Sequence, residues 1–140
     1  ALGSMYGGLC LGPVNTSAVH ALSYGLGGKF HISHGLANAI LLPEVMFFNL
    51  PASLEKTVQI ALALGVEPGE TEEETALAGI EEIRTLSAAC GIPQHLTEIG
   101  ISEESLEELA GIAMKVTRLL NNNPRNLSFE EAVEIYRTLI

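Results

Sequence analysis

The stretch VHALSYGLGGKFHISHGLANAILLP, residues 19–43, contains three of the chain's four histidines and governs how the whole sequence is interpreted. His20 lies in an apolar segment that the polar residues at 15–17 can cap as a helix. His34 begins a second apolar segment, behind the Gly-Leu-Gly-Gly sequence at 25–28. We expect two helices that meet at this glycine turn and direct both imidazoles toward one point.

Two imidazoles from adjacent helices make half of a metal site. Imidazole nitrogen binds divalent iron, zinc, nickel and copper, but a catalytic site normally has at least three protein ligands. The carboxylate of Glu44 lies more than two helical turns beyond His34. Spacing alone therefore leaves two interpretations, a partial metal site or a core His20 beside a helix-opening His34. His31 is a candidate for a supporting or substrate-facing position, whereas His95 lies in a loop that we expect to be solvated.

Beyond residue 43, apolar residues recur mainly with the spacing of an α-helix. Apolar residues recur on one helical face at Leu77, Ile80, Ile83 and Leu86, and again at Leu106, Leu109, Ile112, Val116 and Leu119 or Leu120. Helix starts are indicated at Thr71 with Glu74, at Ser102, and at Ser128 with Glu131. Gly65, Gly91 and Gly100 follow the apolar periods as helix ends. The only extended candidate is KFHI at 29–32, so the pattern predicts an all-α domain of roughly seven helices.

Two further expectations concern packing. The segment at 34–50 is apolar on nearly every side, which predicts a buried helix that Pro43 kinks or divides, followed by a separate helix from Pro51. Four glycines near the start are spaced so that a neighbouring helix could approach closely. They are Gly3, Gly7, Gly8 and Gly12.

Composition and charge exclude several classes of protein. The chain has 140 residues, of which 47% are apolar, and this suits one folded domain. Seventeen acidic against seven basic residues give a formal charge of −10, which disfavours nucleic acids and anionic membranes as partners. No run of 18 apolar residues and no signal peptide is seen, so we expect a soluble, cytoplasmic protein. Cys10 and Cys90 lack metal-site spacing and are expected to be free, buried thiols.

The residues at 19–43 resemble the signature of the iron-dependent alcohol dehydrogenases, also called group III. In that family Val-His-Ala-Leu is followed by Leu-Gly-Gly, then His-Gly-x-x-Asn-Ala and Leu-Leu-Pro. LLNNNPRNLSFEEAVEIYRTL, residues 119–139, is similar to the Asn-Pro-Arg segment and terminal helix of the same proteins. The resemblance covers essentially all of residues 1–140.

The resemblance implies that these residues are the C-terminal all-helical, metal-binding part of a dehydroquinate-synthase-like fold. The chain, which begins at Ala1 in helix-compatible sequence, then looks cut from a longer protein whose N-terminal domain binds NAD or NADP. The implied metal is Fe2+, with Zn2+ as the alternative, and it acts as a Lewis acid while hydride moves between a small alcohol or aldehyde and the nicotinamide. His20 and His34 match two metal ligands, and the remaining ligands come from upstream. The resemblance also implies a homo-oligomer.

Departures from the family pattern fall close to the histidines. Tyr24 stands where members often have a second histidine near the nicotinamide. Its hydroxyl is therefore the candidate for the proton relay at this position. Ser33 and Gly25 replace prolines that are common in the family. Two other interpretations stay open: a helical interaction module without catalysis, and a zinc-dependent relative of the glycerol dehydrogenase or dehydroquinate synthase type. On any of them, we expect the isolated chain to fold without turning over substrate.

Overall fold

In the computed structural model, residues 1–140 are described with every side chain except that of Pro13, and the described backbone contains helices but no strand. The elements are α1 (Leu2–Val14), α2 (Ala18–Phe30), α3 (His34–Ala63), α4 (Glu72–Ala89), η1 (Leu96–Ile99), η2 (Glu103–Ser105), α5 (Leu106–Ala113), α6 (Thr117–Leu120) and α7 (Phe129–Arg137). The predicted all-α architecture is confirmed, with seven α-helices and two short 3-10 helices among the described residues.

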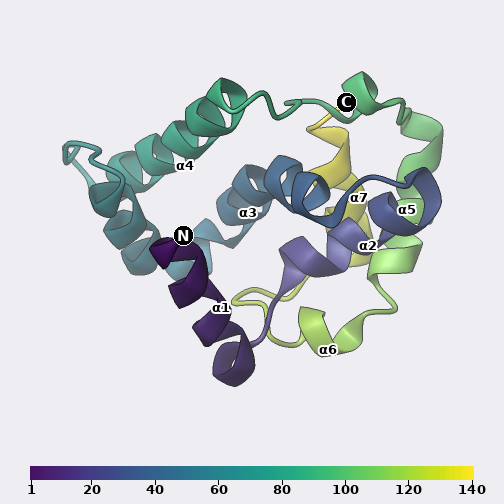
Figure 1. Cartoon of the computed structure of the whole chain (residues 1–140), viewed down its shortest axis with the longest axis horizontal. Helices are drawn as coiled ribbons and strands as arrows, with labels where there is room; N and C mark the ends of the chain where they lie inside the picture. The colour runs from purple at the N-terminus through teal and green to yellow at the C-terminus, as the bar shows by residue number, and fades with distance from the viewer.

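The long helix α3 is the centre of the packing (Figure 1). It packs on α2 and on α4, while α5 joins α2 to α7. The main core lies where α2, α3, α5 and α7 meet, and its fully buried side chains include Leu22, Leu26, Leu41, Leu109 and Tyr136. The Tyr136 hydroxyl donates to the Leu22 carbonyl oxygen at 2.7 Å, so α7 is tied directly to the helix that carries His20.

Several local signals in the sequence are confirmed. Thr71 and Glu74 form a reciprocal capping box at the start of α4, and Ser128 and Glu131 form another at the start of α7. In each capping box, the hydroxyl of the N-cap residue accepts from the backbone N–H of the third helical residue, and the carboxylate of that glutamate accepts from the backbone N–H of the N-cap residue. Glycines with positive φ stand just beyond three helical segments, as predicted: Gly65, Gly91 and Gly100.

The predicted kink of α3 occurs at a different residue. Backbone angles stay helical through Pro43, and the one non-helical position recorded within α3 is Ser53, with φ −142° and ψ 23°. Pro51 removes a backbone donor two residues earlier and crowds the preceding turn. The Ser53 hydroxyl donates instead to the Asn49 carbonyl at 2.9 Å. The separate helix expected from Pro51 is therefore confirmed as the part of α3 beyond this kink, whereas the kink expected at Pro43 does not occur.

The helix predicted from Ser102 to Leu120 is interrupted. Ser102 precedes the short η2, α5 ends at Ala113, and α6 begins only at Thr117. Val116, with φ −91° and ψ 53°, breaks the helical path between them. A continuous apolar periodicity thus spans two helices, because periodicity records which side faces the core and not where the backbone turns.

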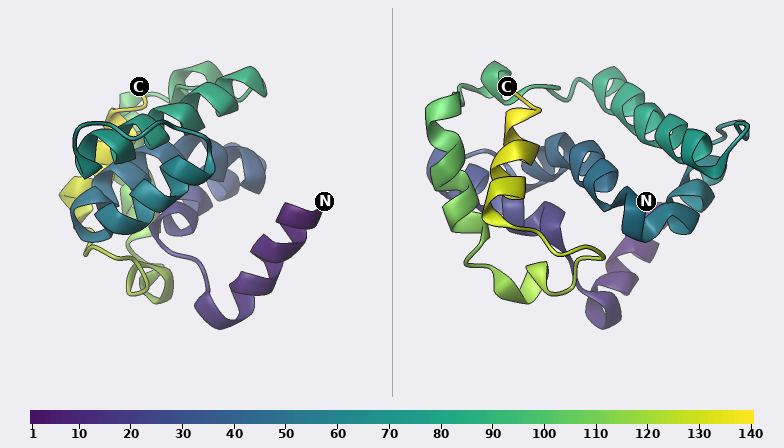
Figure 2. Two further views of the ribbon diagram at one scale, coloured as in Figure 1. Left: turned by 90° about the vertical axis from the view of Figure 1, so that its left-hand side faces the viewer. Right: turned by 180° about the vertical axis from the view of Figure 1, so that it is seen from behind.

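Helix α1 stands apart from the other helices (Figure 2). Its large apolar residues are all exposed: Leu2, Met5, Tyr6, Leu9, Leu11 and Val14. The close helix contact expected at its glycines is not found among the described residues, since a Cβ built at any of Gly3, Gly7, Gly8 or Gly12 would have no neighbour within 4 Å. At its C-terminal end, the Asn122 amide donates to the carbonyls of Val14 and Thr16.

The expectation of buried cysteines is wrong. Cys10 lies on α1 and Cys90 caps the C-terminal end of α4, and both thiols are free and exposed. Burial was expected because free cysteines are usually buried, but burial depends on whether another element covers that helix face.

By length and composition alone, α3 could cross a membrane, since an 18-residue window within it has a mean hydropathy of 1.3. Hydropathy of this kind is shared by helices at the centre of a packed domain. A third of that window is buried within this chain, and α3 contacts α2, α4 and α7. We therefore describe α3 as the central packing helix.

Candidate metal centre

His20 and His34 are brought together by the adjacent helices α2 and α3. His20 lies in the first turn of α2, which begins after the N-cap residue Ser17, and His34 is the first residue of α3. Their ring centroids are 5.1 Å apart, with an angle of 61° between the ring planes. The two imidazoles therefore share one location, as the spacing in the sequence predicted.

The reversal between these helices does not lie at the glycines. Gly25, Gly27 and Gly28 all belong to α2, which continues to Phe30. The chain reverses one turn later, where His31 adopts the left-handed conformation with φ 56°. Gly25 has a packing role instead: a Cβ there would lie 2.7 Å from Leu109 Cδ2, so its absence lets α2 approach α5 closely.

The His34 ring has a polar neighbour beside each nitrogen. The Ser23 hydroxyl lies 3.5 Å from His34 Nδ1 and donates to the His20 carbonyl at 2.9 Å. Asn38, one turn further along α3, places its amide nitrogen 3.0 Å from His34 Nε2. The Asn38 amide oxygen is buried and has no hydrogen-bond partner among the described residues. In the sequence, Ser23 gives no signal beyond its position three residues after His20.

His20 borders a cavity of about 380 Å³ at the start of α2 and α3. Residues Asn15, Thr16, Ser17, Val19, Asn38, Ala39 and Leu42 line the rest of it. Burial, and to a smaller extent the neighbouring His34, lowers the pKa of His20 from its ordinary value. A lowered pKa favours the neutral imidazole, which is the form that can donate a lone pair to a metal.

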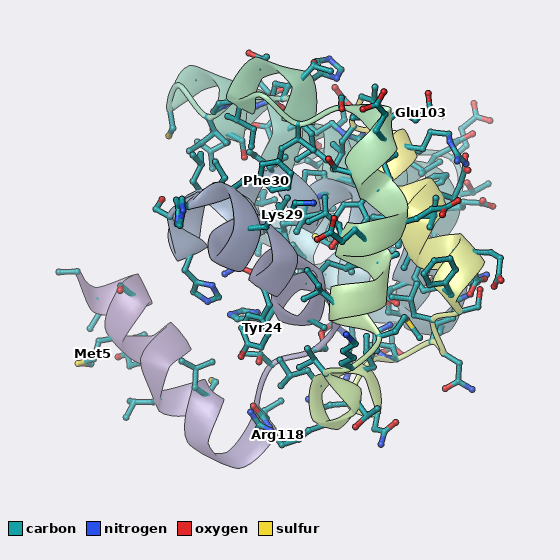
Figure 3. All side chains as sticks on the ribbon, turned by 90° about the vertical axis from the view of Figure 1, so that its right-hand side faces the viewer. Met5, Tyr24, Lys29, Phe30, Glu103 and Arg118 are labelled. Atoms are coloured by element: carbon teal, nitrogen blue, oxygen red, sulfur yellow. The ribbon has the colours of Figure 1, made fainter. Side chains whose placement is uncertain are left out.

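Tyr24 lies near the pair, whereas His31 and His95 do not join it. The Tyr24 ring centroid is 6.4 Å from that of His34, and 43% of the residue is exposed. Figure 3 shows Tyr24 on the side of α2 that is turned toward α1. His31 is exposed at the reversal, and none of the recorded side-chain contacts joins it to His20 or His34. His95 is exposed in the loop before η1, as expected.

No third metal ligand completes the pair within the described residues, where no group of three or more His, Cys, Asp and Glu side chains could hold a metal ion. Glu44, the carboxylate next along α3, is engaged elsewhere. Its Oε1 accepts from the Arg84 side chain of α4 at 2.7 and 3.2 Å. Burial by itself lowers the pKa of Arg84, but its bonds and charges with Glu44 and Glu81 outweigh that and raise it. Glu44 is thus part of the contact between α3 and α4.

The whole chain, residues 1–140, matches the model of the Fe-containing alcohol dehydrogenase family, C-terminal. It is 37% identical over 139 residues to the lactaldehyde reductase of Escherichia coli (strain K12), covering 99% of this chain and 36% of that protein. It is 38% identical over 138 residues to the 1,3-propanediol dehydrogenase of Citrobacter freundii, covering 98% and 35%. The solved alcohol dehydrogenase from Oenococcus oeni superposes with a TM-score of 0.90 at 30% identity, covering 95% of this chain and 35% of that one. The chain thus spans about a third of the length of these relatives.

Proposed function

This chain belongs to the Fe-containing alcohol dehydrogenase family, and we propose on that premise that it is the metal-binding helical part of an NAD(P)-dependent alcohol dehydrogenase. In this proposal, His20 and His34 are two ligands of a catalytic Fe2+ ion. The observation that carries the proposal is the distance of 5.1 Å between the two imidazole centroids.

The residues present fit a divalent metal. Two imidazoles that share a metal at about 2.0–2.1 Å from their nitrogens have ring centres roughly 5 Å apart. The lowered pKa of His20 favours a neutral ring, and the cavity beside it gives an approach to that ring. Neutral nitrogen ligands also leave a bound cation its positive charge. Zn2+ would suit the same two nitrogens. The choice of iron therefore rests on the family and not on the two ligands.

The chemistry that such a metal supplies when bound is Lewis acidity, which lowers the pKa of an alcohol hydroxyl and favours transfer of hydride from its carbon to nicotinamide. The histidines hold the metal, and the cavity lined by Asn15, Thr16 and Leu42 receives the alcohol or aldehyde. The relatives' names, lactaldehyde reductase and 1,3-propanediol dehydrogenase, favour a small oxygenated substrate.

We also propose that the Tyr24 hydroxyl exchanges a proton with solvent beside the site, since the residue is 43% exposed and its ring lies near His34. His31, expected to face the substrate or support a ligand, stays a weaker proposal because it lies at the reversal without a recorded contact to either histidine.

The dinucleotide and the other ligands belong to a part of the protein outside these 140 residues. The relatives are almost three times as long as the stretch they share with this chain. We propose that an N-terminal domain binds NAD or NADP and completes the metal site, and that the whole protein is a cytoplasmic homo-oligomer. Alone, the chain should show no turnover with Fe2+, NAD and short alcohols, and metal-dependent reduction of NAD would contradict this.

Metal titration of the chain tests the proposed ligands directly. Two imidazoles held together should bind Zn2+ or Co2+ measurably in calorimetry at neutral pH. Binding should be lost in His20→Ala and in His34→Ala, while His95→Ala, which changes an exposed histidine elsewhere, should bind like the wild type. Equal binding by all four proteins would overturn the ligand assignment. No binding by any of them would favour an interaction module without a metal.

A further inference from the structure

The hydrogen-bond partners of His34 define which of its nitrogens carries a proton. Ser23 has one hydroxyl hydrogen, and it is donated to the His20 carbonyl at 2.9 Å. Toward His34 Nδ1, at 3.5 Å, the Ser23 oxygen can therefore only accept, which favours the tautomer with the hydrogen on Nδ1. Asn38 Nδ2 carries only hydrogens and lies 3.0 Å from Nε2, an arrangement that suits a lone pair on Nε2.

Both contacts select the same neutral form, with the proton on Nδ1 and the lone pair on Nε2. We propose that Ser23 and Asn38 are positioning residues for His34: Ser23 keeps the proton on Nδ1, and Asn38 occupies the Nε2 lone pair until a metal ion displaces it. This inference rests on the proposed function, because it assigns roles around one of the two proposed ligands.

The Asn38 side chain is suited to be displaced. Its contact with Nε2 leaves its own oxygen buried without a partner among the described residues, and an unpaired buried acceptor is unfavourable. When the amide moves away from Nε2, that oxygen can form a hydrogen bond again. This offsets part of the free energy that is lost with the hydrogen bond between Asn38 and His34. Asn38 also lines the cavity of about 380 Å³ beside His20, so there is room for the movement.

Ser23 should favour metal binding, whereas the Asn38 amide opposes it. It is buried, with 1% of its surface exposed, and it joins both histidines through the His20 carbonyl and His34 Nδ1. Such partners of a ligating histidine fix its tautomer and orientation in metal sites. Removing the Ser23 hydroxyl should therefore weaken metal binding, whereas removing the Asn38 amide should strengthen it. A purely structural role for the two residues would not give changes of opposite sign.

The first test reads the His34 tautomer without any metal, by 15N NMR of the imidazole nitrogens, with the signal assigned through its loss in His34→Phe. The wild-type chain should carry the proton on Nδ1. Asn38→Asp should move it to Nε2, because a carboxylate can only accept a hydrogen bond. Asn121→Ala, which changes an exposed asparagine after α6, should behave like the wild type. A wild-type proton on Nε2 would overturn the inference.

The second test measures Zn2+ affinity by calorimetry, with thermal unfolding followed in parallel. Asn38→Ala should bind Zn2+ about threefold to tenfold more tightly, because one hydrogen bond no longer has to be broken. Ser23→Ala should bind about tenfold more weakly. If the wild type binds and both variants match it while only their melting temperatures fall, the inference alone is overturned. If the wild type binds no Zn2+, the proposed function fails and the inference with it.

Discussion

Helices α7 and α1 are both short, yet they relate to the rest of the chain in opposite ways. Helix α7 has a capping box, acidic residues in its first turn and a buried face formed by Ala132, Val133, Ile135 and Tyr136. Helix α1 has no side-chain cap and no acidic first turn, and its large apolar residues, such as Leu9 at 66%, are exposed.

The difference concerns where the apolar surface of each helix is buried. The polar face of α7 meets solvent and its apolar face packs on the core of this chain. Helix α1 is apolar on all sides, a pattern typical of helices that are buried on all sides. Its contacts within the described residues do not provide that environment. Stability should therefore depend strongly on α7 and very little on α1.

The largest effect is expected for Tyr136→Ala. The change empties a fully buried site and removes the hydrogen bond to the Leu22 carbonyl. We expect the free energy of unfolding to fall by about 4 kcal/mol, as for other large aromatic truncations in cores. Urea unfolding followed by circular dichroism measures it. The matched change on α1 is Tyr6→Ala, at a residue that is 57% exposed, and it should cost less than about 0.5 kcal/mol. Equal losses in the two variants would contradict the comparison.

A smaller effect is expected for Arg125→Ala, just before α7. The guanidinium donates to the Phe48 carbonyl at 3.0 Å and to Glu131 at 2.7 Å, and it lies 4.0 Å from the centre of the Phe48 ring. Because the side chain is partly exposed, we expect a loss of about 1–2 kcal/mol. Thermal unfolding tests this, with Arg118→Ala as a control on α6. An unchanged melting temperature would mean that Arg125 does not hold α7 against α3.

The capping box of α7 should contribute somewhat less. Ser128→Ala removes the acceptor for the Glu131 backbone N–H at 3.1 Å, which typically costs about 1 kcal/mol. Ser128→Asp keeps an acceptor at the cap and should restore most of the loss in chemical unfolding. If Ser128→Asp and Ser128→Ala destabilise the chain equally, Ser128 does not stabilise it through the capping hydrogen bond.

The smallest change in stability is expected for Leu9→Glu on α1, within about 0.5 kcal/mol of the wild type. Its effect should be on association, because the exposed apolar surface of α1 favours contact between molecules. Sedimentation velocity over a range of concentrations should show less self-association in the variant than in the wild type. A large loss of folding stability would show instead that α1 packs on this chain in solution.

Local signals in the sequence predicted local structure well. The capping boxes at Thr71 and Ser128 and the positive φ of Gly65 each depend on a few neighbouring residues, so their patterns are sufficient. The meeting of His20 with His34 was also predictable, because one short reversal joins their two helices.

Features set by contacts between distant segments were not predictable in the same way. The exposure of Cys90 and the turn before α6 both depend on which element lies across from them. The role of Ser23 is of the same kind, since a serine among apolar residues gives no indication that an imidazole from another helix lies beside it.

The kink at Ser53 has a consequence for which part of the molecule unfolds locally. Beyond it, the second half of α3 pairs with α4, and Gly79 of α4 sits so close that an added Cβ would lie 2.4 Å from Ala61 Cβ. The buried residues of this helical hairpin, such as Ala61 and Ile80, lie outside the main core cluster. It can therefore act as a separate cooperative unit. Backbone amides in α4 should exchange their hydrogens with solvent through openings that leave the amides around His20 and Leu22 protected.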